Sequence, residues 1–204
     1  MHHDPAADAE SAADGRAMQR LAAGQDAALD ELMERHAGRL CAYLRRMLDH
    51  HADAEDLAQE VFVRVYQHRA RFDPNRPFGA WLYAIAGNLV RDRYRWRARH
   101  AEASLEALSE TASGAAMLGA APATSATQTP GEDLARLEVG EAVQRAVGEL
   151  PLELREAVVL AEFEERSHQE IGEVLGCTAK AVEMKLYRAR ALLRKRLGGW
   201  LKSG

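Results

Sequence analysis

Apolar side chains recur at every third or fourth position through most of the chain, which is the period of amphipathic α-helices. The first long stripe starts after Asp26, and a turn near His50 is expected to end it. Its positions are Leu29, Leu32, Met33, His36, Leu40, Tyr43, Leu44 and Met47. Strand-like alternation is almost absent, so the pattern predicts an all-α fold.

Two further helices are expected before the pattern changes. The segment "DAEDLAQEVFVRVYQHRARF" is amphipathic, with Asp53 as its expected N-cap. Its apolar face consists of Leu57, Val61, Phe62 and Val65. The following "DPNRP" ends the helix, because each proline disfavours helix in the residue before it. A third helix is expected from about Pro77 to about Arg99.

The composition changes between Ser104 and Gly131, where residues are small, polar and nearly uncharged and no apolar period persists. We interpret this segment as a flexible linker between two helical domains. Helical spacing resumes beyond it, and Pro151 interrupts that spacing. The expected units are an acidic, partly helical N-terminal segment at 1–24, a domain at 25–102, the linker at 103–131 and a second domain at 132–200.

The second domain has the spacing of a helix-turn-helix. Ser167 and Glu170 form a capping box that starts one helix, and Thr178 caps the next. Gly172 is small enough for a close helix crossing, and Gly176 suits the tight turn. The expected buried residues are Ile171, Val174, Leu175, Val182, Leu186, Ala189 and Leu193. This arrangement predicts a DNA-binding motif whose second helix enters the major groove.

The exposed face of that second helix consists of Lys180, Glu183, Met184, Tyr187 and Arg188. Arg188 is suited to guanine or phosphate, and Glu183 to the amino group of cytosine. Eight Lys or Arg against one Glu between Lys180 and Lys202 provide for phosphate anchoring. The alternative interpretation is a solvated basic helix end.

The stretch "GNLVRDRYRWRARH" places an arginine at every second position, yet on a helix of about 100° per residue these arginines divide between faces. One face is predicted to carry Asn88, Arg91, Arg95 and Arg99, and the other Leu82, Ile85, Leu89 and Trp96. Arg93 and Arg97 widen the charged side, and only Asp92 offsets five arginines, so this face is expected to meet a polyanion. The alternative is a solvated surface, which would usually alternate charges of opposite sign. The nearby aromatic residues, suited either to stacking on unpaired bases or to the core, are Trp81, Tyr83 and Tyr94.

Composition limits the remaining classes of function. The net charge of -4 over 204 residues does not attract the whole protein to nucleic acid, so nucleic-acid binding must rest on local basic clusters. Cys41 and Cys177 form no CxxC pair and are expected to be buried thiols. The N-terminus is acidic and no run has transmembrane length, so a cytoplasmic protein without membrane insertion is expected.

No arrangement of residues suggests an enzyme. The sequence has no nucleophile elbow, phosphate loop or paired carboxylates, so we expect no catalytic residues and no cofactor. A metal site is imaginable from His50, His51 and Asp53, but a turn explains them better and no metal is expected.

Three segments resemble, in order, regions two and four of the extracytoplasmic-function (ECF) sigma factors of bacterial RNA polymerase: "DAEDLAQEVFVRVY", "RFDPNRPFGAWLYAIAGNLVRDRYR" and "LPLELREAVVLAEFEERSHQEIGEVLGCTAKAVEMKLYRARALL". The resemblance implies that region two recognises and melts the minus-ten element and that region four reads the minus-thirty-five element as duplex. It also implies three partners: promoter DNA, an anti-sigma factor, and core polymerase through the clamp helices of its largest subunit and the flap of its second-largest subunit.

The resemblance carries functional positions onto this chain. The core-polymerase positions are Asp56, Gln59 and Glu60. The minus-ten positions are Arg71, Asp73, Asn75, Arg76, Trp81 and Asn88, with residues 71–77 forming the loop that captures a flipped base, and the helical wheel adds Arg91 and Arg95. The minus-thirty-five positions are Lys180, Glu183, Met184, Tyr187 and Arg188.

Two departures from family patterns affect these expectations. Trp81 is followed by Leu82 where primary sigma factors have a second tryptophan, so melting is expected to depend more on promoter sequence. Glu183 and Met184 replace a basic residue and a serine, which implies an unusual minus-thirty-five preference. The alternatives are a stand-alone helix-turn-helix regulator and, less well supported, a nucleic-acid-processing enzyme.

Overall fold

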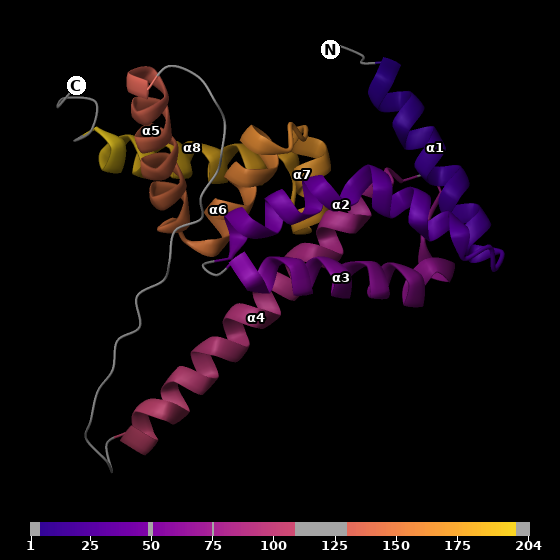
Figure 1. Ribbon diagram of the computed structural model, residues 1–204, viewed down its shortest axis with the longest axis horizontal. Helices are drawn as coiled ribbons and strands as arrows, with labels where there is room; N and C mark the ends of the chain where they lie inside the picture. Colours follow the sequence, from indigo (N-terminus) through magenta and orange to yellow (C-terminus); the bar gives the residue numbers. More distant parts are fainter. Residues whose placement is uncertain (1–4, 49–50, 75, 109–129, 199–204) are drawn as a thin grey trace.

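The computed structural model describes residues 5–48, 51–74, 76–108 and 130–198, and within these ranges every regular element is helical (Figure 1). The elements are α1 Pro5–Ala22, α2 Ala27–Met47, α3 His51–His68, the short 3₁₀ turn η1 Arg69–Arg71, α4 Phe78–Leu108, α5 Pro130–Gly148, α6 Leu152–Val158, the π-helical turn η2 Val159–Phe163, α7 His168–Leu175 and α8 Ala179–Leu197. The predicted all-α fold is confirmed.

The N-terminal bundle is built on α2, which packs against α1, α3 and α4. Its predicted stripe is confirmed, since every residue of it is buried or half-buried, with Leu32, Leu40 and Tyr43 fully enclosed. Helix α4 continues past the expected end near Arg99 to Leu108. The extension "AEASLEAL" consists mostly of strong helix formers, which carry the helix into the composition change near Ser104.

Asp53 does not have the predicted N-cap position, because α3 already starts at His51. Its carboxylate instead binds two arginines of α4. Arg93 Nη2 donates to Asp53 Oδ1 at 2.7 Å, and Arg97 donates to Asp53 Oδ2. Asp53 therefore ties the start of α3 to α4.

The helix-turn-helix of the C-terminal domain is confirmed. Ser167 Oγ accepts from the Glu170 backbone N–H at 3.3 Å, and the Glu170 carboxylate accepts from the Ser167 backbone N–H at 2.9 Å. Gly176 has φ of 65°, the left-handed conformation that favours glycine, and Thr178 caps α8. A Cβ on Gly172 would lie 2.6 Å from the Cys177 carbonyl oxygen, so the close approach is to the turn itself.

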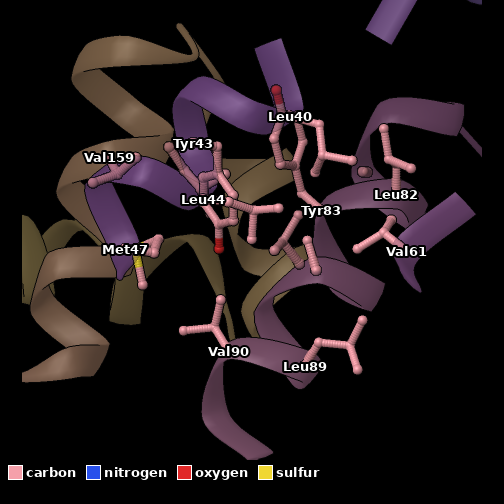
Figure 2. Packing of buried hydrophobic residues seen from close by; sticks show 14 of the residues in the cluster. Leu40, Tyr43, Leu44, Met47, Val61, Leu82, Tyr83, Leu89, Val90 and Val159 are labelled. Atoms are coloured by element: carbon pink, nitrogen blue, oxygen red, sulfur yellow. The ribbon is translucent and has the colours of Figure 1, made fainter. Parts of the chain in front are cut away.

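The two bundles pack on each other to form one hydrophobic core. Helix α4 contacts α7, and α2 contacts α5, α6 and η2. Val159 of the C-terminal domain belongs to the same buried cluster as Tyr43 and Met47 of α2 (Figure 2). Helix α1 lies at the other end of α2, away from α5–α8 (Figure 1). We call this packing of α6, η2 and α7 on α2 and α4 the closed arrangement.

The remaining expectations concern the linker, the thiols and the hydropathy of the helices. Of the expected linker at 103–131, residues 109–129 lie outside the described ranges, and so does His50. Cys41 and Cys177 are free and half-buried. Within the described part of the chain, no helix combines the length and the apolar character needed to cross a bilayer.

Candidate nucleic-acid interface

The arginine face of α4 is only partly free. Asn88, Arg95 and Arg99 are exposed, whereas Arg91 is half-buried. Arg91 Nη2 donates to Asn88 Oδ1 at 2.9 Å, and Arg95 pairs with Asp92 at 2.5 Å. The row predicted from the helical wheel therefore exists, but its first arginine is engaged within the protein.

The structure corrects one feature of the predicted wheel and adds a partner to another. Trp96 was placed on the buried face, yet it is 48% exposed and stacks on His100 with ring centroids 3.9 Å apart. Both aromatic contacts of its ring lie within α4 itself, since the Arg93 guanidinium also lies 6.0 Å from the centre of the Trp96 ring. Arg93 and Arg97 flank the row as predicted, but both bind Asp53, which offsets their charge. A count of charges within α4 alone could not reveal that acid.

Between η1 and α4, a backbone hydrogen bond and a group of aromatic rings hold the described residues on either side of Asn75. Arg76 N–H donates to the Asp73 carbonyl oxygen at 3.0 Å, and their side chains approach to 3.8 Å. Arg71, Asp73 and Arg76 are exposed, while Asn75 lies outside the described residues. The rings of Phe72 and of Phe78, at the two ends of the loop, pack against each other and against Trp81.

The three aromatic residues near the basic run therefore differ in environment. Trp81 is half-buried inside this cluster, 5.3 Å from Phe72 between ring centroids. Tyr83 is 2% exposed and belongs to the core. Tyr94 is half-buried, and its hydroxyl donates to the Met47 carbonyl oxygen at 2.9 Å. In the closed arrangement Tyr83 and Tyr94 therefore belong to the protein core and are not placed to stack on bases.

The predicted polymerase-binding residues form one exposed stripe on α3. Asp56, Gln59 and Glu60 are all exposed, and Glu60 pairs with Arg64 at 2.7 Å. Sequence reasoning missed Val63, which continues the same stripe and is 52% exposed. A valine seven residues after Asp56 on an otherwise polar face was the available signal.

The predicted minus-thirty-five face of α8 is exposed throughout: Lys180, Glu183, Met184, Tyr187 and Arg188. Met184 and Tyr187 are 44% and 65% exposed, so this face also offers apolar surface to a partner. Lys180 Nζ donates to Glu183 Oε2 at 2.8 Å, and this hydrogen bond lowers the pKa of Glu183. The carboxylate is therefore available as an acceptor, as readout of a cytosine amino group requires.

A buried acid of α6 joins the two domains. Glu156 is 1% exposed, and its Oε2 accepts from Arg91 Nη1 at 2.6 Å. Its Oε1 accepts from Tyr43 Oη at 3.3 Å. Burial raises the pKa of Glu156 above its ordinary value, although Arg91 and Tyr43 oppose that shift. Burial also raises the pKa of Tyr43, and the negative charge of Glu156 adds to this.

The neighbouring Arg155 makes a second buried link across the interface. Arg155 Nη1 donates to the Met47 carbonyl oxygen at 3.0 Å and to Tyr94 Oη at 2.8 Å. The same guanidinium donates to the Gly148 carbonyl oxygen within its own domain. Arg155 and Tyr94 together satisfy the Met47 carbonyl at the C-terminal end of α2, where no intrahelical donor is available.

The turn after η2 makes a third link. Tyr83 Oη donates to Glu164 Oε2 at 2.5 Å, and the Arg166 guanidinium lies 5.4 Å from the centre of the Tyr83 ring. Glu165 between them has φ of 51°, a strained left-handed conformation for a residue other than glycine. Burial raises the pKa of Glu164, and it also raises the pKa of Tyr83.

Taken together, the fold and these surfaces define a two-domain helical DNA-binding protein of the sigma-70 class. Residues 32–100 match the family model for Sigma-70 region 2, and residues 140–193 match that for Sigma-70 region 4. The chain is 33% identical over 174 residues to the ECF RNA polymerase sigma factor SigW of Bacillus subtilis (strain 168), covering 85% of this chain and 91% of that protein. It is 35% identical to the RNA polymerase sigma factor CarQ of Myxococcus xanthus, covering 89% of this chain and 95% of CarQ.

Solved structures agree. The structure of CnrH in complex with the cytosolic domain of CnrY matches with a TM-score of 0.66 at 30% identity, covering 92% of this chain and 98% of that chain. The chain therefore belongs to the ECF sigma factors of bacterial RNA polymerase, and the resemblance noted from its motifs is confirmed.

Proposed function

We propose that this protein is an alternative sigma factor that joins core RNA polymerase, directs it to promoters through their minus-ten and minus-thirty-five elements, and helps to melt them. Family membership carries this proposal, because both DNA-binding regions occur in the family's order over nearly the whole chain. As an initiation factor acting with cytoplasmic polymerase, it needs no catalytic residues or cofactor of its own.

Within this function, the loop from Arg71 to Pro77 and Asn88 select the minus-ten base, and Arg91 and Arg95 hold the backbone. The exposed Asp73–Arg76 turn before α4 and the exposed Arg95 farther along the same helix support this division, since phosphate contacts position a protein and base contacts specify the sequence. The exposed side chains of α8 read the minus-thirty-five element, with Glu183 as a base acceptor and Lys180 and Arg188 on the phosphates.

The exposed stripe of α3 binds the clamp helices of the largest polymerase subunit. The acids Asp56 and Glu60 give it negative charge, and Val63 adds an apolar contact that a partner helix can cover. Region four, for its part, is proposed to contact the flap of the second-largest subunit, as the resemblance implies.

The closed arrangement is the resting state of the free protein in this proposal. The Glu156 carboxylate binds Arg91 through a negatively charged acceptor, as a DNA phosphate would. Glu156 of α6 and the phosphates of the minus-ten element therefore compete for the Arg91 guanidinium. Polymerase binding would then favour the separated domains by population shift. The related CnrH was solved with the cytosolic domain of CnrY, and we propose that an anti-sigma factor likewise holds this chain inactive.

The test is transcription from a promoter selected with the reconstituted holoenzyme, comparing core polymerase with and without this protein. Initiation that requires the protein supports the proposal. Tight binding of the free protein to duplex operator DNA, with no gain of initiation by core polymerase, would instead establish a stand-alone helix-turn-helix regulator.

A further inference from the structure

Helix α1 lies outside both segments that match the sigma-70 models, yet it is tightly bound to the domain that contains the minus-ten loop. Ala17, Met18 and Leu21 are at most 1% exposed. The helix contacts α2, and it also contacts η1 and α4, the two elements that flank residues 71–77. It therefore contacts both supports of the loop.

A buried polar pair connects α1 to α2 at this place. Asp14 and His36 are 2% and 3% exposed, and Asp14 Oδ2 lies 2.7 Å from His36 Nε2. Asp14 Oδ1 accepts from Arg35 Nε at 2.9 Å, so both carboxylate oxygens have partners. A hydrogen bond to an ionised group in a buried site fixes the ring it binds more firmly than packing alone.

The ring of His36 in turn contacts the start of α4. Its centroid lies 5.1 Å from that of Phe78, the first residue of the helix. Phe78 contacts Phe72 at 6.1 Å and Trp81 at 6.2 Å between centroids. Because Phe72 and Phe78 stand at opposite ends of the loop, one aromatic cluster sets the distance and direction of both ends.

We propose that Asp14 and His36 are positioning residues for minus-ten recognition: their buried pair orients Phe78, and the Phe72–Phe78–Trp81 cluster then holds the two ends of the loop that accepts a flipped base. The inference rests on the proposed function of that loop. It gives α1 a role in promoter specificity, although no residue of α1 touches the base.

Metal binding is the competing explanation of this cluster, since ligand atoms of Glu10, Asp14 and His36 lie within 4.8 Å of one another. The charges argue against it. Arg35 already binds Asp14 and Arg39 already binds Glu10, so two cations neutralise the two acids. A bound metal ion would have to displace both arginines.

The test uses the holoenzyme and fork-junction DNA whose single-stranded minus-ten segment carries each natural base, or an abasic site, at every position in turn. The readout is the ratio of affinities for the preferred base and the abasic site at the flipped position. Asp14→Asn keeps the side-chain volume but removes the negative charge from the 2.7 Å contact, and His36→Phe keeps an aromatic ring but removes the nitrogen that makes it. Each is expected to lower the ratio about fivefold, with unchanged binding to core polymerase.

Arg20→Gln is the matched control, because Arg20 and Glu31 also join α1 to α2 but are exposed. It is expected to leave the ratio unchanged. An equal fall in Arg20→Gln would mean that any loosening of α1 acts on the loop, which contradicts a specific role for Asp14 and His36. If one of the two variants does not fold, the other decides alone, and added zinc or chelator should have no effect in the wild type.

The two proposals fail differently. If the wild-type holoenzyme shows no base preference at the flipped position, or if Asp73→Ala and Arg76→Ala leave that preference unchanged, the loop's proposed function is wrong. If that preference exists but Asp14→Asn and His36→Phe leave the ratio unchanged, only the positioning role is overturned.

Discussion

Glu156 occupies the space beside Gly87 that any larger residue would need. A Cβ on Gly87 would lie 2.1 Å from Glu156 Oε1, far inside van der Waals contact. The end of an exposed glutamate could swing away at little cost. Glu156 is buried and bound by Tyr43 and Arg91, so displacing its carboxylate would break both hydrogen bonds.

Gly87→Ala is therefore expected to open the closed arrangement. Losing two hydrogen bonds to a buried charge should weaken domain docking by about 2 kcal/mol. The radius of gyration from small-angle X-ray scattering should rise in the free protein, and its binding to promoter DNA should strengthen.

Gly140→Ala provides the matched control, since Gly140 is also helical and nothing lies within 4 Å of its added Cβ. It should stabilise the protein slightly, by about 0.5–1 kcal/mol, without changing the radius. Equal radii for wild type and Gly87→Ala would show that Glu156 does not hold the domains together.

The buried acids predict that the closed arrangement tightens as pH falls. Burial raises the pKa of Glu156 and of Glu164, so the closed form binds their protons more tightly than the open form. The added stability of the closed arrangement is largest at low pH. It is lost as pH rises through the raised pKa values, which lie above the ordinary glutamate pKa of about 4.3. The charged and titratable groups that face these acids are Tyr43, Arg91 and Lys185 for Glu156, and Tyr83, Arg39, Arg46 and Arg166 for Glu164.

The measurement is the radius of gyration in a titration from pH 8 down to about pH 5, with helix content followed by circular dichroism. The double variant Glu156→Gln/Glu164→Gln, which cannot titrate at either position, should show a flatter response. A wild-type radius that grows on acidification while helix content stays constant would contradict the prediction.

The structural features that could be predicted from the sequence are those that depend on residues close together in the chain. The capping box at Ser167, the left-handed Gly176 and the cap at Thr178 depend on neighbours three or fewer residues away, and all three are confirmed. Glu156 gave no such signal, because "LELREAVV" looks like an ordinary amphipathic helix and its partner Arg91 is 65 residues away. Only the docking of two domains brings them together.

The same reason explains the misplaced residues of α4. A helical wheel distributes side chains around one axis, but it does not say where the neighbouring helices end. Trp96 is exposed although the wheel groups it with Leu82 and Leu89, and Asp53 of another helix neutralises two arginines of α4. The apolar stripe of α2 was predictable because that helix is covered along its whole length.

Arg91 and Arg95 are expected to contribute to the salt dependence of promoter binding by the holoenzyme. Replacing each with alanine should lower the slope of log affinity against log salt by about 0.9 for every phosphate that the arginine neutralises. Arg16→Ala, an exposed arginine on α1, is the control and should leave the slope unchanged. An unaltered slope in Arg91→Ala and Arg95→Ala would remove both residues from the DNA interface.

The α3 stripe is expected to control assembly of the holoenzyme. Asp56→Ala/Gln59→Ala, and separately Val63→Ser, should weaken binding to core polymerase about tenfold, because all three residues are exposed and contribute little to folding. Glu55→Ala is the control on the same helix, since Glu55 faces α2 and pairs with Arg45 at 3.0 Å. Fluorescence anisotropy with labelled protein measures the affinity, and normal binding by the stripe variants would place the polymerase-binding surface elsewhere.

Glu183 is expected to determine one base pair of the minus-thirty-five element. Removing a side chain that accepts a hydrogen bond from one base should relax discrimination at that position by about 1–3 kcal/mol. Glu183→Ala also frees Lys180, its partner at 2.8 Å, for a phosphate, so total affinity should fall less than selectivity. Selection of minus-thirty-five duplexes from a randomised pool by the holoenzyme measures both. Glu173 is an exposed acid on α7, and the control variant Glu173→Ala should select the same DNA sequence as the wild type. If Glu183→Ala also selects the wild-type sequence, Glu183 reads no base.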